Sequence, residues 1–240
     1  MEENKISIGM LIFPKMTQLD FTGPFEALAR VPNAQVHVIW KNKDPVTSDT
    51  GLSFLPTTTV AECPPLDVIC IPGGPGQIEL MDDSEIIAFV RDQGAKAKYV
   101  TSVCTGALVL GAAGLLEGYE AATHWMSADQ LPLFGAKPVA KRVVVDRNRI
   151  TGGGVTAGID FGLYLAGQLA GEDTARRIQL FLEYDPAPPF NSGSPRTASA
   201  PLVQGVRDWA AKMLERRWAA SHRAAERLKA SRGTAANPMR

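Results

Sequence analysis

A cysteine lies at the joint between two sequence patterns, in the stretch YVTSVCTGALVLGAAGLL. An apolar, β-rich run ends at Cys104, and a helix of small residues begins at Thr105. The small neighbours Gly106 and Ala107 allow the sharp turn that presents a nucleophile in hydrolases. Free N–H groups at the start of that helix favour the thiolate, which predicts a lowered thiol pKa. The joint therefore predicts that Cys104 is a nucleophile rather than a packing residue.

Asp20 is the candidate acid or base for such a nucleophile. It lies in LDFTGPFEAL, just beyond the first predicted strand, where an aspartate can also serve as a helix cap. His124, in ATTHWM, either partners a thiolate or is a partly buried structural histidine. Cys63 precedes two prolines and Cys70 lies inside an apolar run, so both are predicted to be packing residues.

Glycines follow two further apolar runs, in ICIPGGPG and ITGGGVTAG. Because glycine allows close backbone approach, the N–H groups of Gly73 and Gly74 are predicted to converge on a developing charge or to steady the sulfur. A tight turn explains the same two glycines equally well. The second run lacks the GK[ST] of a phosphate loop. It is predicted instead to let a helix start near Val155, close to the Cys104 turn.

Alternating strand and helix patterns must position these residues. The strand runs are apolar on both faces, which is typical of a parallel sheet covered by helices on both sides. In such a sheet, reactive groups gather at the carboxyl ends of the strands. The fold class expected is therefore α/β, a single-domain sandwich with a mostly parallel central sheet. The first strands are expected at 6–13, 36–40, 68–71 and 99–103, and the first helices at 19–29, 84–97 and 105–115.

The second half of the chain continues this alternation and then changes character. Short strands are expected within 46–59 and at 120–123, 141–145 and 149–151, with helices at 155–170 and 172–183. The Pro-, Ser- and Gly-rich stretch 184–201 cannot hold a helix. We expect one domain over 1–201, a helix over 202–232 packed on that domain or on a dimer partner, and a frayed tail over 233–240. The helix is predicted to bury an apolar stripe of Trp209, Met213 and Leu214 and to leave its basic face in solvent.

Composition narrows the class of protein. The chain has 240 residues, with 25 Lys plus Arg and 25 Asp plus Glu, so no net charge directs it to nucleic acid or an anionic membrane. Its apolar runs are shorter than the roughly 20 residues that a bilayer needs. Three cysteines without a CxxC pair and three scattered histidines do not indicate a disulfide framework or a zinc site. A cytoplasmic protein without a metal is expected.

The motifs LDFTGP, DVICIPGG, TSVCTGALVLGAAGLLEG, ATTHW and TGGGVTAGIDFGL resemble, in this order, the ThiJ/PfpI superfamily. Within it, the sequence is most similar to the isonitrile hydratases, over nearly the whole chain. The resemblance implies a flavodoxin-like, class I glutamine amidotransferase-like sandwich and a homodimer. It also implies a nucleophile at Cys104 and an acidic partner at Asp20, where many relatives have glutamate. Thr105 stands where the protease-like branch often has histidine, which disfavours protease and deglycase activity.

The resemblance implies hydration of an isocyanide, R–NC, to an N-substituted formamide. Cys104 would attack the terminal carbon while Asp20 delivers a proton, forming a covalent thioimidate that Asp20-activated water then resolves. Thr105 would orient Asp20 or the water. Val155 and His124 are expected beside the substrate, and no cofactor is needed.

Two other functions fit the same motifs. Domains of this kind also form the sensing half of AraC-type regulators, but the 40 or so residues after Pro201 show no helix-turn-helix pattern. A thiol redox or glyoxal-processing enzyme would use the same cysteine. A nucleic-acid partner and a membrane partner are not expected.

Overall fold

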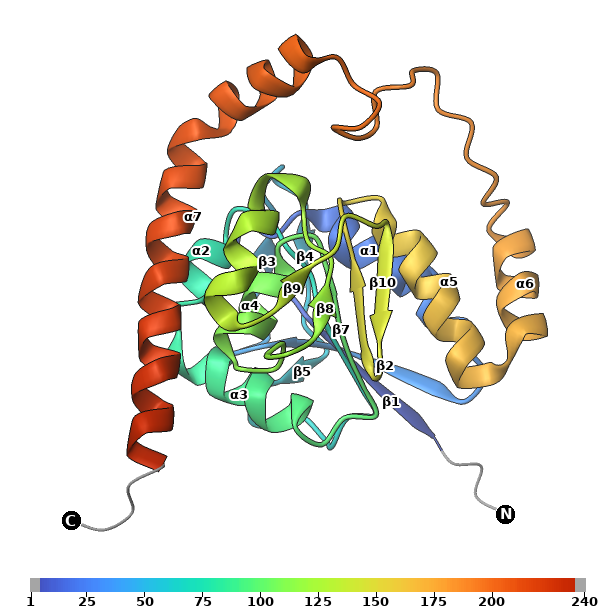
Figure 1. Ribbon diagram of the computed structural model, residues 1–240. Coiled ribbons are helices and arrows are strands. Elements are labelled where there is room, and N and C mark those ends of the chain that lie inside the picture. The colour runs from blue at the N-terminus through green and yellow to red at the C-terminus, as the bar shows by residue number, and fades with distance from the viewer. Residues whose placement is uncertain (1–4, 236–240) are drawn as a thin grey trace.

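A seven-stranded sheet forms the centre of the computed structural model, which describes residues 5–235 (Figure 1). The strand order is β10-β11-β7-β6-β1-β2-β5, and β10 alone runs antiparallel to its neighbour. This arrangement confirms the predicted α/β fold with a mostly parallel sheet. The strands are β1 (Ile6–Leu11), β2 (Ala34–Trp40), β5 (Thr58–Thr59), β6 (Val68–Ile71), β7 (Tyr99–Val103), β10 (Val143–Asp146) and β11 (Arg149–Gly152).

The register of the central strands brings the three motif-bearing turns to one edge of the sheet. Ile71 of β6 pairs with Ser102 of β7, and Val103 of β7 pairs with Gly152 of β11. The residues that follow, Pro72 and Cys104 among them, therefore emerge side by side. Every residue of β6 is buried, as expected of a strand covered on both faces.

Helices cover both faces of the sheet (Figure 1). On one face, α1 (Gln18–Leu28) packs against α5 (Ala157–Ala170), which packs in turn against α6 (Glu172–Phe181). On the other, α4 (Gly106–Ala112) packs against α2 (Gln77–Leu80), α3 (Ser84–Gly94) and the 3₁₀ helix η1 (Trp125–Phe134). The apolar side chains between these layers form the core.

The C-terminal helix α7 (Ala200–Ala235) runs across η1, α2 and α4. The buried positions among its described side chains are small or polar: Ala210, Arg217, Ala220, Ser221, Ala224 and Ala225. The predicted stripe is wrong at Trp209, which is 84% exposed, because that residue lies one position away from the buried face. The residues between α6 and α7 form an irregular arm over the top of the molecule (Figure 1).

The structure contains several short strands and a 3₁₀ helix whose bounds the sequence does not predict in detail. The excursion after β2 contains an antiparallel pair, β3 (Val46–Thr47) with β4 (Ser53–Phe54), before β5 joins the sheet. A separate small ladder joins β8 (Glu120–Ala121) to β9 (Lys137–Pro138). The sequence patterns do not indicate β9, which has only two residues. They do not indicate η1 either, because a 3₁₀ helix lacks the apolar period of 3.6 residues that marks an α-helix. The division into a domain over 1–201 and a separate helix stays a prediction, and positions 236–240 of the expected frayed tail lie outside the described residues.

Candidate functional site

Cys104 occupies a strained turn between β7 and α4. Its φ is +55°, a region that a residue with a side chain rarely adopts. Two hydrogen bonds to the Cys104 backbone hold the turn. The Cys104 N–H donates to Gly152 O (3.1 Å), and the Thr123 hydroxyl donates to the Cys104 carbonyl (2.8 Å). The backbone of Ile71 also lies so close to Gly106 that a Cβ would not fit there. The sharp turn predicted from the small residues is therefore present.

Asp20 lies directly beside this turn, although it precedes Cys104 by more than eighty residues in the chain. It is on α1, its side chain is fully buried, and its interaction with the Cys104 thiol lowers the Asp20 pKa. The Gly73 N–H donates to Asp20 Oδ2 (2.9 Å). Among the described residues, Asp20 Oδ1 has no hydrogen-bond partner, so one acceptor atom remains open beside the thiol.

Burial shifts the proton affinities of both groups upward. It raises the pKa of Asp20 from 3.8 to about 7, against the lowering effect of the hydrogen bonds from Cys104 and Gly73. Burial and the Asp20 carboxylate together raise the pKa of the Cys104 thiol well above its usual value. The expectation of a lowered thiol pKa is therefore wrong: the Thr105 N–H and the Arg217 charge act in that direction but do not overcome burial.

Gly73 and Gly74 hold the partners of the cysteine rather than its sulfur. The Gly73 N–H is bound to Asp20, and the Gly74 N–H donates to Thr105 Oγ1 (3.0 Å). Because both donors are occupied, the structure gives no support to the expected oxyanion role. Gly73 must be glycine, since a Cβ there would lie 2.5 Å from Thr105 N and 2.9 Å from Asp20 Oδ2. The Thr105 hydroxyl thus holds the Gly73–Gly74 turn in place. It acts on Asp20 only indirectly, because Gly73 of the same turn binds the Asp20 carboxyl group.

His124 is a helix cap in this structure. Its Nδ1 accepts the Met126 N–H at the start of η1 (3.4 Å). Burial and the nearby Arg217 lower the pKa of His124 to about 4, so the ring is neutral at neutral pH. A neutral imidazole cannot form an ion pair with a thiolate. The structural alternative for His124 is the one that these contacts support.

Arg217 is a functional candidate that the sequence patterns did not reveal. It lies on α7, within a face predicted to be solvated, yet it is only 3% exposed. Its guanidinium donates to Gln77 Oε1 (3.0 Å) and Ser127 Oγ (3.2 Å), which are both neutral. Burial lowers the pKa of Arg217, and the Cys104 thiolate raises it. A buried cation therefore acts on the site from the far end of the sequence.

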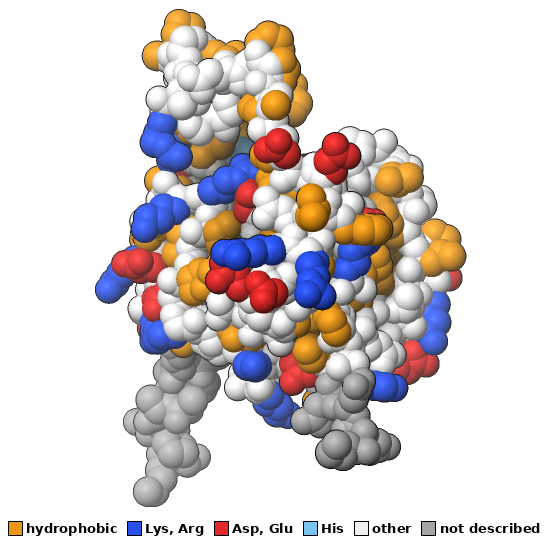
Figure 2. Space-filling model, turned by 90° about the vertical axis from the view of Figure 1, so that its right-hand side faces the viewer, with side chains coloured by type: hydrophobic (Ala, Val, Ile, Leu, Met, Phe, Trp, Pro, Cys, Tyr) orange, Lys and Arg blue, Asp and Glu red, His pale blue; other side chains and the backbone are white. Residues whose placement is uncertain are grey.

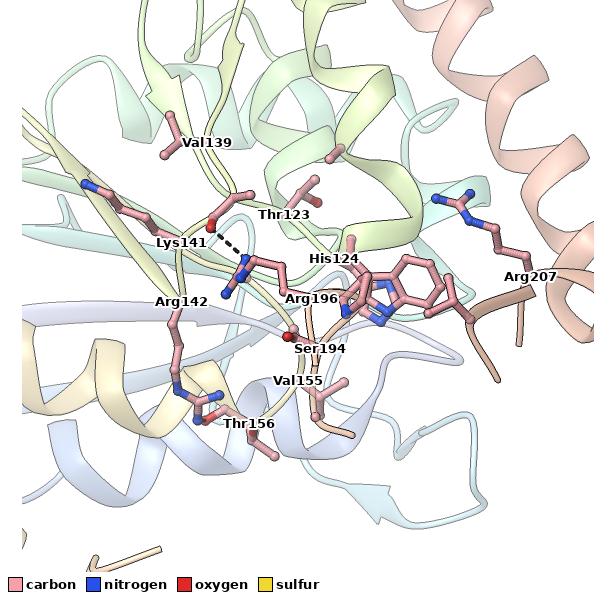
Figure 3. A pocket seen from close by; sticks show the side chains of 18 residues that line it. Thr123, His124, Val139, Lys141, Arg142, Val155, Thr156, Ser194, Arg196 and Arg207 are labelled. Atoms are coloured by element: carbon pink, nitrogen blue, oxygen red, sulfur yellow. Dashed lines mark hydrogen bonds between the residues drawn. The ribbon is translucent and has the colours of Figure 1, made fainter. Parts of the chain in front are cut away.

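A cavity of about 630 Å³ adjoins the turn (Figure 3). Val155 and His124 line it, and so does Thr123, which holds the Cys104 carbonyl. Cys104 and Asp20 are not among the residues that line the cavity. The cavity therefore lies next to the turn that holds Cys104 and outside the Cys104–Asp20 pair.

The other two cysteines lie outside this constellation. Burial raises the pKa of Cys63 to about 11 and that of Cys70 to about 12. In the part of the chain that the structure describes, no three His, Cys, Asp or Glu side chains are grouped to hold a metal ion. The described helices include none with the length and apolar character needed to cross a membrane.

Comparison of the sequence with known proteins finds an enzyme, a transcriptional regulator and a protein family that match this chain. The chain is 57% identical over 223 residues to an isonitrile hydratase from Pseudomonas putida, which covers 93% of this chain and 98% of that protein. It is 28% identical over 191 residues to the HTH-type transcriptional regulator GbdR of Pseudomonas aeruginosa, covering 76% of this chain and 52% of the regulator. The sequence pattern of the DJ-1/PfpI family matches residues 6–168.

Solved structures agree with these matches. A ThiJ/PfpI family protein from Pseudomonas syringae superposes with a TM-score of 0.89 at 46% identity, over 91% of each chain. DJ-1beta of Drosophila melanogaster superposes with a TM-score of 0.69 at 23% identity, over 76% of this chain and all of that chain, a likeness of fold alone. The elbow cysteine, the sheet order and these matches lead to one conclusion: this chain belongs to the DJ-1/PfpI family.

Proposed function

We propose that this protein is an isonitrile hydratase, which adds water to an isocyanide and releases an N-substituted formamide. The observation that carries the proposal is the buried pair of Cys104 and Asp20, which places a nucleophile and a proton carrier in contact. The 57% identity to the Pseudomonas putida isonitrile hydratase supports it. The enzyme is thus a hydro-lyase with a cysteine nucleophile.

The first step uses the proton that the pair shares. In the singly anionic pair, transfer of the thiol proton to Asp20 gives a thiolate and a carboxylic acid in contact. The thiolate attacks the terminal carbon of R–NC and forms a carbon–sulfur bond, and Asp20 gives its proton to that carbon. The product is the thioimidate R–N=CH–S–Cys104, beside an Asp20 carboxylate. A carboxyl pKa of about 7 lets Asp20 accept and return the proton at neutral pH.

The second step uses the same carboxylate on water. Asp20 takes a proton from water, whose oxygen adds to the thioimidate carbon, and the proton passes to the nitrogen. The tetrahedral intermediate R–NH–CH(OH)–S–Cys104 then breaks its carbon–sulfur bond. The hydroxyl proton returns to the Asp20–Cys104 pair, and R–NH–CHO leaves. Atoms and charges balance to R–NC plus water giving the formamide, and no electron is gained or lost.

Thr105 and the glycine turn supply the positioning for both steps. The Thr105 N–H lowers the pKa of the Cys104 thiol, and the Thr105 hydroxyl holds Gly74. Gly73 in turn fixes the Asp20 carboxyl group. These roles of Cys104, Asp20 and Thr105 are part of the proposal.

The other candidate functions are not favoured. A sensing domain does not need a nucleophile and a proton carrier in contact, and the regulator GbdR is matched over only 52% of its length at 28% identity. A glyoxal-processing enzyme of the protease-like branch would be expected to have histidine, where this chain has Thr105.

The test is a direct assay of product. Purified protein is incubated with 4-nitrophenyl isocyanide, and N-(4-nitrophenyl)formamide is measured by mass spectrometry. We expect turnover by the wild type and none above background by Cys104→Ala. Formamide production by Cys104→Ala at the wild-type rate would overturn the mechanism, and no production by the wild type would overturn the function.

We also propose that the protein is a cytoplasmic homodimer. Large apolar side chains are exposed on α6 and on the arm and the start of α7, among them Phe181 (72%), Phe190 (78%) and Trp209 (84%). Figure 2 shows hydrophobic side chains gathered on the protruding top of the molecule, which the arm and the start of α7 form. Such a surface favours coverage by a second chain. Three free cysteines suit a reducing compartment. Sedimentation equilibrium checks the assembly.

A further inference from the structure

The cavity beside the Cys104 turn is built from two unlike parts of the chain. Its inner side contains Thr123, His124 and Val155, which adjoin the elbow. Its outer side is closed by the arm and the first turns of α7, which contribute Arg196 and Arg207. At about 630 Å³, the cavity has the size of typical small-molecule sites. Its lining reaches the elbow through Thr123, whose hydroxyl donates to the Cys104 carbonyl.

The lining combines apolar and cationic side chains. Trp125, Val139, Val155 and Val203 give it apolar walls. The charged residues in the lining are Lys141, Arg142, Arg196 and Arg207, and the described lining contains no aspartate or glutamate. Since the whole chain has equal numbers of acidic and basic residues, this is a local segregation of charge.

These cations differ in what already binds them. Arg142 is held by an ion pair with Asp160 and by a bond to Thr156 O. Arg196 donates to Ala140 O (3.0 Å), a neutral acceptor, and Arg207 lies over the Trp125 ring (4.9 Å). Figure 3 shows Arg196 and Arg207 on opposite sides of His124. These two guanidinium groups have no carboxylate partner among the described residues.

We propose that the enzyme's substrates are isocyanides whose nitrogen substituent carries a carboxylate and extends from Cys104 into this cavity, where the guanidinium groups of Arg196 and Arg207 attract the carboxylate. A guanidinium group matches a carboxylate in geometry and charge, and a cationic cavity mouth attracts an anion from solution. An uncharged isocyanide would use the apolar walls but would gain nothing from the cations. This inference rests on the proposed hydratase activity.

The experiment compares two isocyanides of nearly equal shape. We would measure kcat/KM for 4-isocyanobenzoate and for its methyl ester at low ionic strength and in 0.5 M NaCl. We expect the carboxylate to be preferred by about tenfold or more at low ionic strength, with the preference shrinking in salt because the charges are exposed. The double variant Arg196→Gln/Arg207→Gln should bring the ratio close to one. A control that removes a positive charge outside the cavity lining, Lys96→Met after α3, should leave the ratio at its wild-type value.

A binding measurement separates this inference from the activity. On Cys104→Ala protein, calorimetry should give N-(4-carboxyphenyl)formamide a roughly tenfold lower Kd than its methyl ester, and Arg196→Gln/Arg207→Gln should remove that difference. Equal kcat/KM for acid and ester, or a preference that survives the double variant, would overturn the assignment of the anion site. Hydration of neither isocyanide would instead overturn the proposed function.

Discussion

Two buried thiols on neighbouring strands show what makes a cysteine reactive in this fold. Cys70 lies inside β6, and Cys104 lies just past the end of β7. Burial raises the pKa of both thiols, and the Asp20 charge acts on both. Only for Cys104 do the Asp20 side chain, the Thr105 N–H and the Arg217 charge all act on the thiol pKa. The difference teaches that position at the strand end, which brings a proton carrier into contact, matters more than a low thiol pKa.

The sharpest way to break this comparison is to remove each thiol in turn. Cys104→Ala should lower kcat/KM for an aryl isocyanide on the order of 10⁴-fold or more, because no covalent intermediate can form. Cys70→Ala should leave kcat/KM within about twofold and cost about 1 kcal/mol of stability from the small cavity it creates. Steady-state kinetics and urea unfolding measure the two quantities. A large loss of activity in folded Cys70→Ala would show that the two thiols are not separable.

The next largest effect should come from substituting Asp20, whose charge acts on both thiols. Asp20→Asn should lower kcat/KM about 10²- to 10³-fold, since it removes the proton carrier. In the wild type, kcat/KM should rise with pH through about 7, because the reactive pair is singly anionic. A neutral aryl isocyanide does not titrate there, so the profile reports the enzyme. A rate that falls as pH rises through 7 would show that the fully protonated pair is the active form.

The raised pKa of Asp20 should also make the free energy of unfolding depend on pH. Its folded pKa of about 7 exceeds the ordinary value of 3.8, so the folded state keeps a proton that the unfolded chain loses between these pH values. The wild type therefore loses stability as pH rises across this window, by at most about 4 kcal/mol. Urea unfolding at pH 5 and pH 8 should show Asp20→Asn gaining on the wild type at the higher pH. Asp129→Asn, an exposed carboxylate on η1, should show no such gain.

Arg217 tests whether the cation contributes to the difference between the thiols. Arg217→Met should lower kcat/KM about tenfold, because the thiolate loses a buried positive neighbour that lowers the pKa of the Cys104 thiol. Arg216→Met is the matched control, because Arg216 precedes Arg217 in the helix but is exposed and pairs with Glu79 on the surface. The pH dependence of thiol alkylation gives a second readout, which should move to higher pH in Arg217→Met alone. Equal kinetics in the two variants would remove Arg217 from the site.

Much of this arrangement could be predicted because it follows local rules. Apolar runs at strand spacing located β1, β6 and β7, and parallel topology places their carboxyl ends together. That is why Asp20 and Cys104, far apart in the chain, could be expected in one site. Small residues after Cys104 indicated the sharp turn, and its φ of +55° agrees.

The parts that could not be predicted depend on packing between distant segments. Arg217 reads as one more basic residue of a solvated helix until α7 is placed against α2 and η1. The rise in the Cys104 pKa depends on burial, which a helix-start motif does not reveal. Glycine indicates close backbone approach but does not indicate which group is approached. The sequence therefore could not show that the N–H groups of Gly73 and Gly74 bind Asp20 and Thr105 rather than a developing charge or the sulfur.

The smallest predicted effect concerns the two threonines that accompany the two thiols. Thr101 lies by Cys70 and donates to Ile69 O (2.9 Å), and Thr105 accepts the Gly74 N–H (3.0 Å). Each change to valine should cost about 1–3 kcal/mol, because each leaves a buried backbone group without its partner. Only Thr105→Val should lower kcat/KM, by roughly three- to tenfold, since only that threonine anchors the turn that holds Asp20. If Thr101→Val lowered kcat/KM equally at matched stability, the loss would reflect general loosening of the sheet, and the strand end would have no special role.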